Sequence, residues 1–320
     1  MLGAMTKTSL EACFLACDER ALARGISLLE GGAAAGGALL RAVRARGGGA
    51  HLVGVTGSPG SGKSTLTDGL IAVARAQGKR VAVLAVDPTS PYSGGAILGD
   101  RIRMMRHHRD AGVFIRSMAT RGHLGGLAAA TLQVTALLDA FGFDLILIET
   151  VGVGQSEVDI VRVADTTLLT LTPGQGDGVQ AFKAGIMEIA DVFVINKADQ
   201  PGSGRLAREV KAALGLAPQE EGWRPPILET VASEGAGIAE LFETLSAHRA
   251  YLEETGSLSA LRQGRVRFEV AALLSERVRG RLARLEPRFI DAVLAGEASA
   301  DELVDTLLGE SPTDEPSLTV

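Results

Sequence analysis

Cysteine, aromatic residues and long apolar runs are scarce in this chain, and each scarcity excludes a class of protein. The chain contains two cysteines, Cys13 and Cys17, four positions apart on an expected helix. This count excludes a disulfide-stapled fold; we expect buried or idle thiols, with metal binding together with a distant histidine as the alternative. Aromatic residues make up 4% of the 320 residues, so the sequence offers no platform on which nucleic-acid bases would stack.

The chain also lacks a net positive charge and apolar segments long enough to cross a membrane. The net charge is −6, whereas a protein that binds a phosphate backbone needs a basic face. No apolar run approaches the roughly 18 residues of a membrane helix, and no leader pattern is present. We therefore expect a cytoplasmic protein that binds neither nucleic acid nor membrane.

Short apolar runs alternate with helical patterns through the middle of the chain. These runs occupy residues 51–55, 81–86, 113–115, 145–148, 167–171, 192–195 and 227–230. They are apolar on both faces, as in the buried strands of a parallel sheet. The pattern predicts an α/β fold in which a mainly parallel sheet is flanked by helices.

The regions on either side of this pattern are predicted to be helical. Within the N-terminal segment, residues 1–48, apolar residues repeat at helical spacing from about residue 10 to residue 46, with interruptions at Gly31-Gly32 and Gly36-Gly37. We expect this helical segment to be followed by a nucleotide-binding domain at 49–250, a helical extension at 251–308 and a disordered tail at 309–320.

The predicted extension combines one apolar helical stripe, from Val266 to Phe289, with many arginines. Pro287 breaks the stripe, and Ser299-Ala300-Asp301-Glu302 is typical of a capping box that opens a last helix through Leu308. We expect this apolar stripe to be buried, either against its own domain or against a second copy of the chain, and we favour the second copy.

A phosphate-binding loop is predicted at Gly57-Ser58-Pro59-Gly60-Ser61-Gly62-Lys63-Ser64, which matches G-x-x-x-x-G-K-[ST] and is followed by Thr65. It lies between an expected strand and an expected helix at 64–77, as this motif requires. Its glycines let backbone N–H groups point at phosphate oxygens, Lys63 reaches the outer phosphates and Ser64 holds Mg²⁺. A structural glycine-rich turn is the alternative interpretation.

A base-reading segment is predicted at Asn196-Lys197-Ala198-Asp199, which follows an apolar strand. The Asp199 carboxylate accepts hydrogen bonds only, so it suits the N1–H and the exocyclic amine of guanine, whereas adenine offers no such donor pair. Lys197 is expected to lay its stem over the base, and Asn196 to tie this segment to the phosphate loop. The two motifs together favour GTP over ATP.

Carboxylates at two further strand ends are candidates for the γ-phosphate region. Asp87 and Glu149 each end an apolar run, so both reach the ligand edge of the sheet, although strand-end capping is the alternative for each. Asp100 is another candidate metal or water ligand. In Glu149-Thr150-Val151-Gly152, the Gly152 amide can meet the γ-phosphate, and Gln155 can orient the attacking water. The candidate catalytic residues are Lys63, Asp87, Glu149 and Gln155.

These segments resemble those of the MeaB/ArgK GTPases. The segments that carry the resemblance are the phosphate loop, Val86-Asp87-Pro88-Thr89-Ser90, 94–104, Arg121-Gly122-His123-Leu124-Gly125-Gly126, Glu149-Thr150-Val151-Gly152-Val153-Gly154-Gln155-Ser156-Glu157 and Asn196-Lys197-Ala198-Asp199. The resemblance runs from about Leu22 to Tyr251, and the arginine-rich end is similar to the dimerising extension of that family.

The resemblance implies a GTP-hydrolysing chaperone that gates cofactor delivery to an adenosylcobalamin-dependent acyl-CoA mutase, typically methylmalonyl-CoA mutase, and protects it from inactivation. It implies that GTP or GDP and Mg²⁺ are bound, that the chain forms a homodimer, and that Ser64, Asp87, Asp100 and Glu149 face the metal. Val231-Ala232-Ser233 would contact guanine through backbone amides. Val231 departs from the Ser-Ala dipeptide that is usual for GTPases at this place.

Two alternatives remain open. A protein kinase that acts on an amino-acid-binding transport protein would share the motifs, but it needs a docking cleft beside the γ-phosphate that the sequence does not declare. A nickel-delivering GTPase would share the core and a carboxylate at the position of Glu149. Such proteins usually expose clusters of Cys and His, whereas this chain has two cysteines and five scattered histidines.

Overall fold

The computed structural model of the chain describes residues 9–87, 105–107, 109–119, 129–150, 159–174, 190–215 and 222–308. These residues fall into two compact units, one ending at Arg265 and the other beginning at Val266. The sheet lies in the first unit, and the described part of the second unit is helical. The finer division expected from the sequence, with boundaries after residues 48, 250 and 308, stays a prediction.

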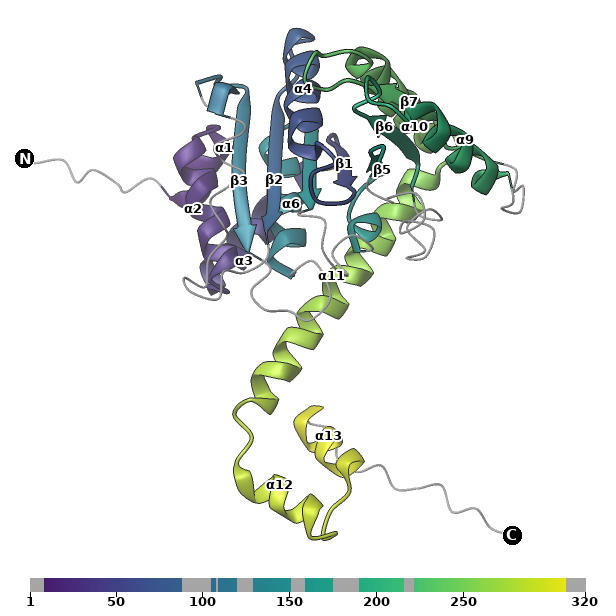
Figure 1. Ribbon diagram of the computed structural model, residues 1–320. Coiled ribbons are helices and arrows are strands. Elements are labelled where there is room, and N and C mark those ends of the chain that lie inside the picture. The colour runs from purple at the N-terminus through teal and green to yellow at the C-terminus, as the bar shows by residue number, and fades with distance from the viewer. Residues whose placement is uncertain are drawn as a thin grey trace, which may run out of the picture. The chain divides into compact units, whose positions relative to one another are not determined.

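Seven strands form one sheet, as the apolar runs predict (Figure 1). They are β1 (His51–Thr56), β2 (Val81–Asp87), β3 (Val113–Ala119), β4 (Leu145–Thr150), β5 (Thr166–Leu171), β6 (Val192–Asn196) and β7 (Ile227–Thr230). Their order across the sheet is β3-β2-β4-β1-β5-β6-β7, and every ladder between the described strands is parallel. The central position of β1, between β4 and β5, places its carboxyl end at the crevice where such sheets bind ligands.

Helices cover both faces of the sheet, which explains why the strands are apolar on both sides. On one face, strand residues such as Val53 and Leu168 form a core with α4 (Lys63–Ala76) and α10 (Ile238–Glu254). On the other face, Leu169 and Phe193 pack with α9 (Ser203–Leu214). Leu168 and Leu169 belong to opposite cores because side chains alternate along a strand.

The N-terminal helices belong to the same unit as the sheet. They are α1 (Leu10–Leu15), α2 (Glu19–Glu30), α3 (Ala34–Val43) and the 3-10 helix η1 (Arg44–Arg46). The elements α2, α3 and η1 pack along α6 (Ala129–Phe141). Helix α1 meets α6 through the ring of Phe14, which lies edge to face with that of Phe141 at a centroid distance of 5.0 Å. Two further 3-10 helices are η2 (Met105–His107) and η3 (Ile160–Arg162).

The two predicted glycine interruptions have different outcomes. Gly31 and Gly32 separate α2 from α3, as expected, whereas the interruption predicted at Gly36-Gly37 is wrong because both residues lie inside α3. A Cβ atom at Gly36 would lie 2.8 Å from the backbone nitrogen of Leu29. Gly36 therefore allows α2 and α3 to approach closely instead of ending the helix.

The second unit begins within α11 (Ser257–Leu282) and continues through α12 (Pro287–Leu294) and α13 (Ala300–Leu308). Pro287 opens α12 at a first-turn position, where the N–H that it lacks is not needed. The predicted capping box is confirmed: the Ser299 backbone donates to Glu302 Oε2 at 2.8 Å, and the Glu302 backbone donates to Ser299 Oγ at 3.1 Å. The predicted disordered tail lies outside the described residues.

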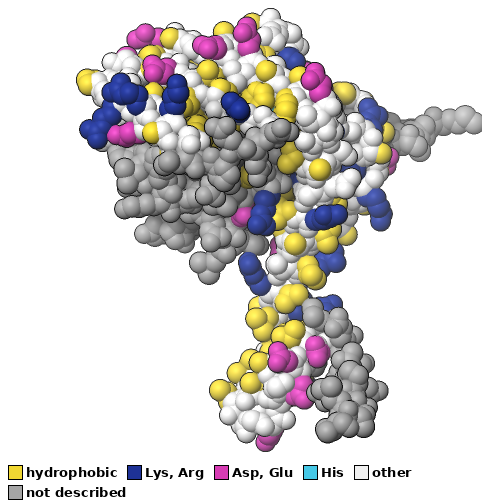
Figure 2. Space-filling view, turned by 90° about the vertical axis from the view of Figure 1, so that its right-hand side faces the viewer, with side chains coloured by type: hydrophobic (Ala, Val, Ile, Leu, Met, Phe, Trp, Pro, Cys, Tyr) yellow, Lys and Arg dark blue, Asp and Glu magenta, His cyan; other side chains and the backbone are white. Residues whose placement is uncertain are grey.

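Apolar side chains lie exposed along the helices of the second unit (Figure 2). The large ones are Val266, Val270, Leu274, Leu282, Ile290, Leu294 and Val304. Among the helices that the structure describes, none combines the length and the apolar character that spanning a bilayer requires.

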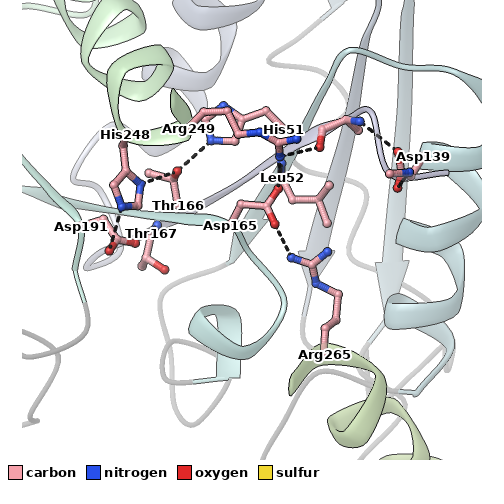
Figure 3. A network of polar contacts seen from close by, with 12 residues as sticks. His51, Leu52, Asp139, Asp165, Thr166, Thr167, Asp191, His248, Arg249 and Arg265 are labelled. Carbon is pink, nitrogen blue, oxygen red and sulfur yellow. Dashed lines mark hydrogen bonds and ion pairs between the residues drawn. The ribbon is translucent and has the colours of Figure 1, made fainter. Parts of the chain in front are cut away.

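A buried polar network joins β1, β5 and α10 at the amino edge of the sheet (Figure 3). Thr166 Oγ1 lies 2.7 Å from His51 Nε2 and 2.8 Å from His248 Nδ1, and His248 Nε2 lies 3.6 Å from Asp191 Oδ1. Burial lowers the pKa of His51 and that of His248 to about 4, and it raises the pKa of Asp191 to about 6. The network is thus held by neutral histidines at neutral pH.

Acid should weaken the fold through these histidines. The unfolded chain binds protons at His51 and His248 below the ordinary pKa of 6.5, whereas the folded chain resists protonation until about pH 4. The free energy of unfolding should therefore fall as the pH drops through this interval, by at most about 3 kcal/mol for His248. Asp191 works in the opposite direction, because its folded form takes up a proton first.

Urea unfolding of the wild type and of His248→Gln at several pH values measures this effect. The variant should lose less stability between about pH 6.5 and pH 4 than the wild type does, since one of the two depressed histidines is gone. Asp191→Asn serves as the opposite control and should steepen the loss. An identical acid dependence in the wild type and in His248→Gln would contradict this account of the network.

Candidate nucleotide-binding site

The predicted phosphate loop connects β1 to α4 at the carboxyl edge of the sheet. Gly57, Gly60 and Gly62 have positive φ angles of 138°, 81° and 91°, so glycine is favoured at each of them. A Cβ atom at Gly57 would lie 2.2 Å from the Thr170 carbonyl oxygen, and one at Gly62 would lie 2.2 Å from Asn196 Nδ2. The loop is therefore packed tightly between β5 and the end of β6.

Lys63 and Ser64 open α4 directly after the loop, and both side chains are buried. The Lys63 ammonium donates to the carbonyl oxygens of Gly57, at 2.6 Å, and of Ser58, at 3.0 Å. A cation is thus held over the loop at the N-terminus of a helix, and both features favour an anionic ligand.

Glu149 comes from β4 and meets the loop from the neighbouring strand. The Ser64 hydroxyl donates to Glu149 Oε1 at 2.5 Å, and Glu149 is buried, with 4% of the residue exposed. Glu149 lies in register with Val55 of β1 and Ala85 of β2, which places it at the centre of the edge. A hydroxyl and a carboxylate are oxygen donors of the kind that Mg²⁺ prefers, so the residues present fit this metal.

The predicted base-reading segment begins at Asn196, the last residue of β6, and the side chain of Asn196 joins it to the phosphate loop. The Asn196 Nδ2 donates to the Ser61 carbonyl at 2.9 Å, and the Asn196 Oδ1 accepts from the Thr230 hydroxyl and from the Ala232 N–H, each at 3.1 Å. The carbonyl can only accept and the N–H can only donate, so these two backbone partners fix the orientation of the amide.

Lys197 and Asp199 lie beyond this junction. Lys197 adopts a φ of 56°, and its Nζ donates to the Gly60 carbonyl at 2.9 Å. Its aliphatic stem therefore crosses from one loop to the other. The Asp199 side chain is exposed, and it is accessible to a ligand.

The last predicted contact segment, at Val231-Ala232-Ser233, forms a tight turn after β7. The Val231 N–H donates to the Ala236 carbonyl at 3.1 Å, and the two residues form an isolated bridge. Ala232 is buried while Ser233 is exposed. The segment therefore lies beside the base-reading segment, held there by the contact between Ala232 and Asn196.

Four of the predicted site residues are described in part or not at all. Asp87 ends β2 at the carboxyl edge, in register with Ala119, and its side chain is outside the described part. Asp100, Gly152 and Gln155 lie outside the described residues altogether.

Two residues that line the junction were missed by sequence reasoning. Thr230 binds Asn196 through its hydroxyl and accepts from the Ala198 N–H through its carbonyl at 3.0 Å, so it contacts the base-reading segment twice. Thr170 places its carbonyl against Gly57. The available signal was their position at or near the carboxyl ends of apolar strands, which Asp87 and Glu149 share.

In the described part of the chain, no group of three or more His, Cys, Asp and Glu side chains is arranged to hold a metal ion. Cys13 is half-buried and Cys17 is exposed, and both are free thiols.

Removal of the Asn196 amide should destabilise the site measurably. In Asn196→Ala, the buried partners at Ser61, Thr230 and Ala232 lose one hydrogen bond each, so the free energy of unfolding should fall by about 2 kcal/mol or more. Lys197→Ala is the control, since it removes one exposed contact to the same loop and should change the free energy by within about 0.5 kcal/mol. Urea titration of both variants checks this, and equal losses would contradict the role given to Asn196.

Comparisons with known proteins agree with this geometry. The model of the family described as "Methylmalonyl Co-A mutase-associated GTPase MeaB" matches residues 22–286. A protein of Pyrococcus horikoshii described as a GTPase is 48% identical over 303 residues, which cover 91% of this chain and 95% of the relative. The "Methylmalonic aciduria type A homolog, mitochondrial" of Mus musculus is 37% identical over 266 residues, which cover 79% of this chain and 64% of that protein.

A solved structure described as "LAO/AO transport system kinase" matches with a TM-score of 0.70 and 26% identity, over 96% of this chain and 99% of that chain. The likeness covers the sheet and its flanking helices, so the predicted α/β fold is confirmed as that of P-loop NTPases. The family model matches most of the chain, and two relatives are 48% and 37% identical to it. The chain therefore belongs to the MeaB/ArgK family of P-loop GTPases.

Proposed function

We propose that this chain binds GTP together with Mg²⁺, hydrolyses it to GDP and phosphate, and uses this cycle to assist an adenosylcobalamin-dependent acyl-CoA mutase. The observation that carries the nucleotide part is the Asn196 amide, which joins the phosphate loop to the segment with Lys197 and Asp199. A nucleotide bound by its phosphates at one loop and by its base at the other requires a fixed spacing between them, and this amide supplies it.

Guanine recognition is assigned to the exposed Asp199 carboxylate. The N1–H and the exocyclic amine of guanine would donate to its two oxygens, whereas adenine would leave a desolvated carboxylate without donors. The Lys197 stem would cover one face of the base, since its ammonium is already held by Gly60. Backbone amides at Val231, Ala232 and Ser233 would complete the base pocket.

The phosphate and metal region is assigned to the centre of the carboxyl edge. Gly57 to Thr65 would cradle the phosphates, with the Lys63 ammonium as their counter-charge. Ser64 and Glu149 would supply oxygen donors for Mg²⁺, and Asp87 and Asp100 would join them. The bound metal would neutralise charge on the phosphates.

Hydrolysis needs a positioned water and a group that meets the γ-phosphate. We assign the first role to Gln155 and the second to the Gly152 amide, because both closely follow Glu149 in the chain. Lys63, Asp87 and Glu149 complete the proposed catalytic set. These assignments rest on the order of the motifs along the chain.

The partner assignment is supported by the names of the family and of one relative. The family description names methylmalonyl-CoA mutase, and the mouse relative is named after methylmalonic aciduria. We therefore propose methylmalonyl-CoA mutase as the partner. The cytoplasm, expected from the sequence, is our proposed site of action. The exposed apolar surface of the second unit supports the proposal that the chain forms a homodimer.

A second candidate function is phosphoryl transfer to a protein, which is favoured by the description of the similar solved structure as a transport system kinase. The two functions differ in where the γ-phosphate goes. With γ-labelled GTP, hydrolysis releases the label as free phosphate, whereas a kinase transfers it to an amino-acid-binding transport protein supplied in the same assay.

Asp199→Asn should change the base that the site prefers. The amide presents a donor where the carboxylate accepted, so affinity for GTP should fall by about tenfold or more, while affinity for xanthosine triphosphate should rise. Calorimetric titration of the variant with both nucleotides measures the exchange, and Asp191→Asn, at the opposite edge of the sheet, is the control. Unchanged preference in Asp199→Asn would show that this carboxylate does not read the base.

Co-purification from the source cell tests the partner. The tagged full chain, loaded with a non-hydrolysable GTP analogue, should retain a cobalamin-dependent mutase, whereas Lys63→Ala, expected to lose nucleotide, should retain less. Recovery of a transport protein in place of a mutase would reverse the assignment in favour of the kinase function.

A further inference from the structure

The buried Asp165 carboxylate is the centre of a second polar cluster, at the edge of the sheet opposite the nucleotide site (Figure 3). Its side chain is 0% exposed. It accepts from the guanidinium groups of Arg249, at 3.0 Å, and Arg265, at 2.6 Å, and from the Leu52 N–H at 3.0 Å. A buried carboxylate is tolerated when it is paired in this way, and removal of one partner is costly.

The two arginines come from different helices. Arg249 lies on α10 and also donates to the Ala50 carbonyl, at 3.1 Å, and to Glu253, at 2.7 Å, so its charge is shared between two carboxylates. Arg265 lies on α11 and is the last residue of the first unit. Asp165 therefore binds the base of α11 to the amino edge of the sheet.

A further arginine of α11 supports this attachment. Arg262 lies one turn before Arg265, on the same side of the helix. A Cβ atom at Gly48 would lie 3.1 Å from Arg262 Nη1, so this guanidinium packs against the segment that leads into β1. Asp139 of α6 holds the same segment through the Gly48 and Ala50 N–H groups, at 2.6 Å and 3.0 Å.

Strand β5 joins this cluster to the phosphate loop. Asp165 directly precedes β5, and all six residues of the strand are buried. Near the other end, the Thr170 carbonyl is packed against Gly57 so closely that a Cβ atom there would lie 2.2 Å away. Ladders to β1 and β6 hold the strand on both sides, so it behaves as a stiff element that transmits a shift at one end to the other.

We propose that Asp165 is an anchor for the base of α11, and that β5 couples this anchor to the phosphate loop, so that nucleotide binding changes how firmly the base of α11 is held. Residues 266–282 continue the same helix, and a change at Arg265 thus reaches the second unit through an unbroken helical backbone. The coupling rests on the proposed function, whereas the anchor does not.

Hydrogen exchange on the full chain tests the anchor. Arg265→Gln removes one guanidinium from Asp165, and exchange at the backbone amides of 257–265 should rise by about tenfold or more because the base of α11 opens more often. Arg267→Gln is the matched control, since Arg267 is exposed on the same helix, and exchange should stay close to that of the wild type. Equal exchange in the two variants would overturn the anchor.

Arg265→Lys keeps the test decisive if Arg265→Gln does not fold. Lysine retains the charge but loses the planar fork that meets a carboxylate, so exchange in 257–265 should rise by about threefold relative to Arg267→Lys. No rise in this second pair would likewise overturn the anchor.

The coupling is tested by the same measurement with GDP and Mg²⁺ present at saturation, as established separately by calorimetry. Bound nucleotide should alter exchange in 257–265 of the wild type and of Arg267→Gln, and this response should be lost in Arg265→Gln. An unaltered α11 in a wild type that has bound GDP would overturn the coupling and leave the anchor intact. A wild type that binds no GDP would overturn the proposed function instead, while the nucleotide-free comparison would still decide the anchor.

Discussion

The arrangement of the candidate site depends on one carboxamide, that of Asn196, which holds two loops from distant parts of the chain at a fixed spacing. One loop contributes a carbonyl acceptor at Ser61 and the other an N–H donor at Ala232. A carboxamide satisfies both at once without carrying a charge, through its NH₂ group and its oxygen. Aspartate in its place would set a carboxylate against the Ser61 carbonyl. A Cβ atom at residue 62 would lie 2.2 Å from the same amide, so the contact needs glycine at that position in addition to the hydrogen bonds.

The two edges of the sheet use buried polar groups in different ways. At the carboxyl edge, Lys63, Ser64 and Glu149 are buried near one another beside the loop, an arrangement that suits an anionic ligand with its metal. At the amino edge, charged groups bind one another: Asp165 is matched by Arg249 and Arg265, and the histidines are neutral. The first edge is thus built to receive charge from outside, and the second to fix helices to the sheet.

Much of the fold follows from local sequence patterns, because strands buried on both faces must be apolar throughout. All seven apolar runs form strands, and the capping box at Ser299 and Glu302 opens a helix. The glycine pair Gly36-Gly37 shows where reasoning from local sequence fails. The pair predicts a break in the helix, but Gly36 is needed because the neighbouring helix α2 packs closely against it. Where two helices cross depends on tertiary contacts, which a short stretch of sequence does not reveal.

The candidate site likewise has parts that local sequence predicts and parts that it does not. Loops with their own motifs, at Gly57 to Ser64 and at Asn196 to Asp199, could be located from sequence because backbone geometry or hydrogen-bonding chemistry restricts several adjacent positions. Thr230, Thr170 and Asp165 could not, since each is a common strand-end residue whose role arises from partners far away in the chain. Their positions at or near strand ends make these residues candidates for a role, but their contact partners can be identified only from the fold.

The most direct test of the account is calorimetric titration of the purified wild-type chain with GTP and, separately, with ATP in the presence of Mg²⁺. The account predicts one bound GTP per chain and an affinity at least about tenfold weaker for ATP, because adenine leaves the Asp199 carboxylate without donors. Equal affinity for both nucleotides, or no binding of either, would contradict the claim that the two loops joined by Asn196 form one guanine-nucleotide site.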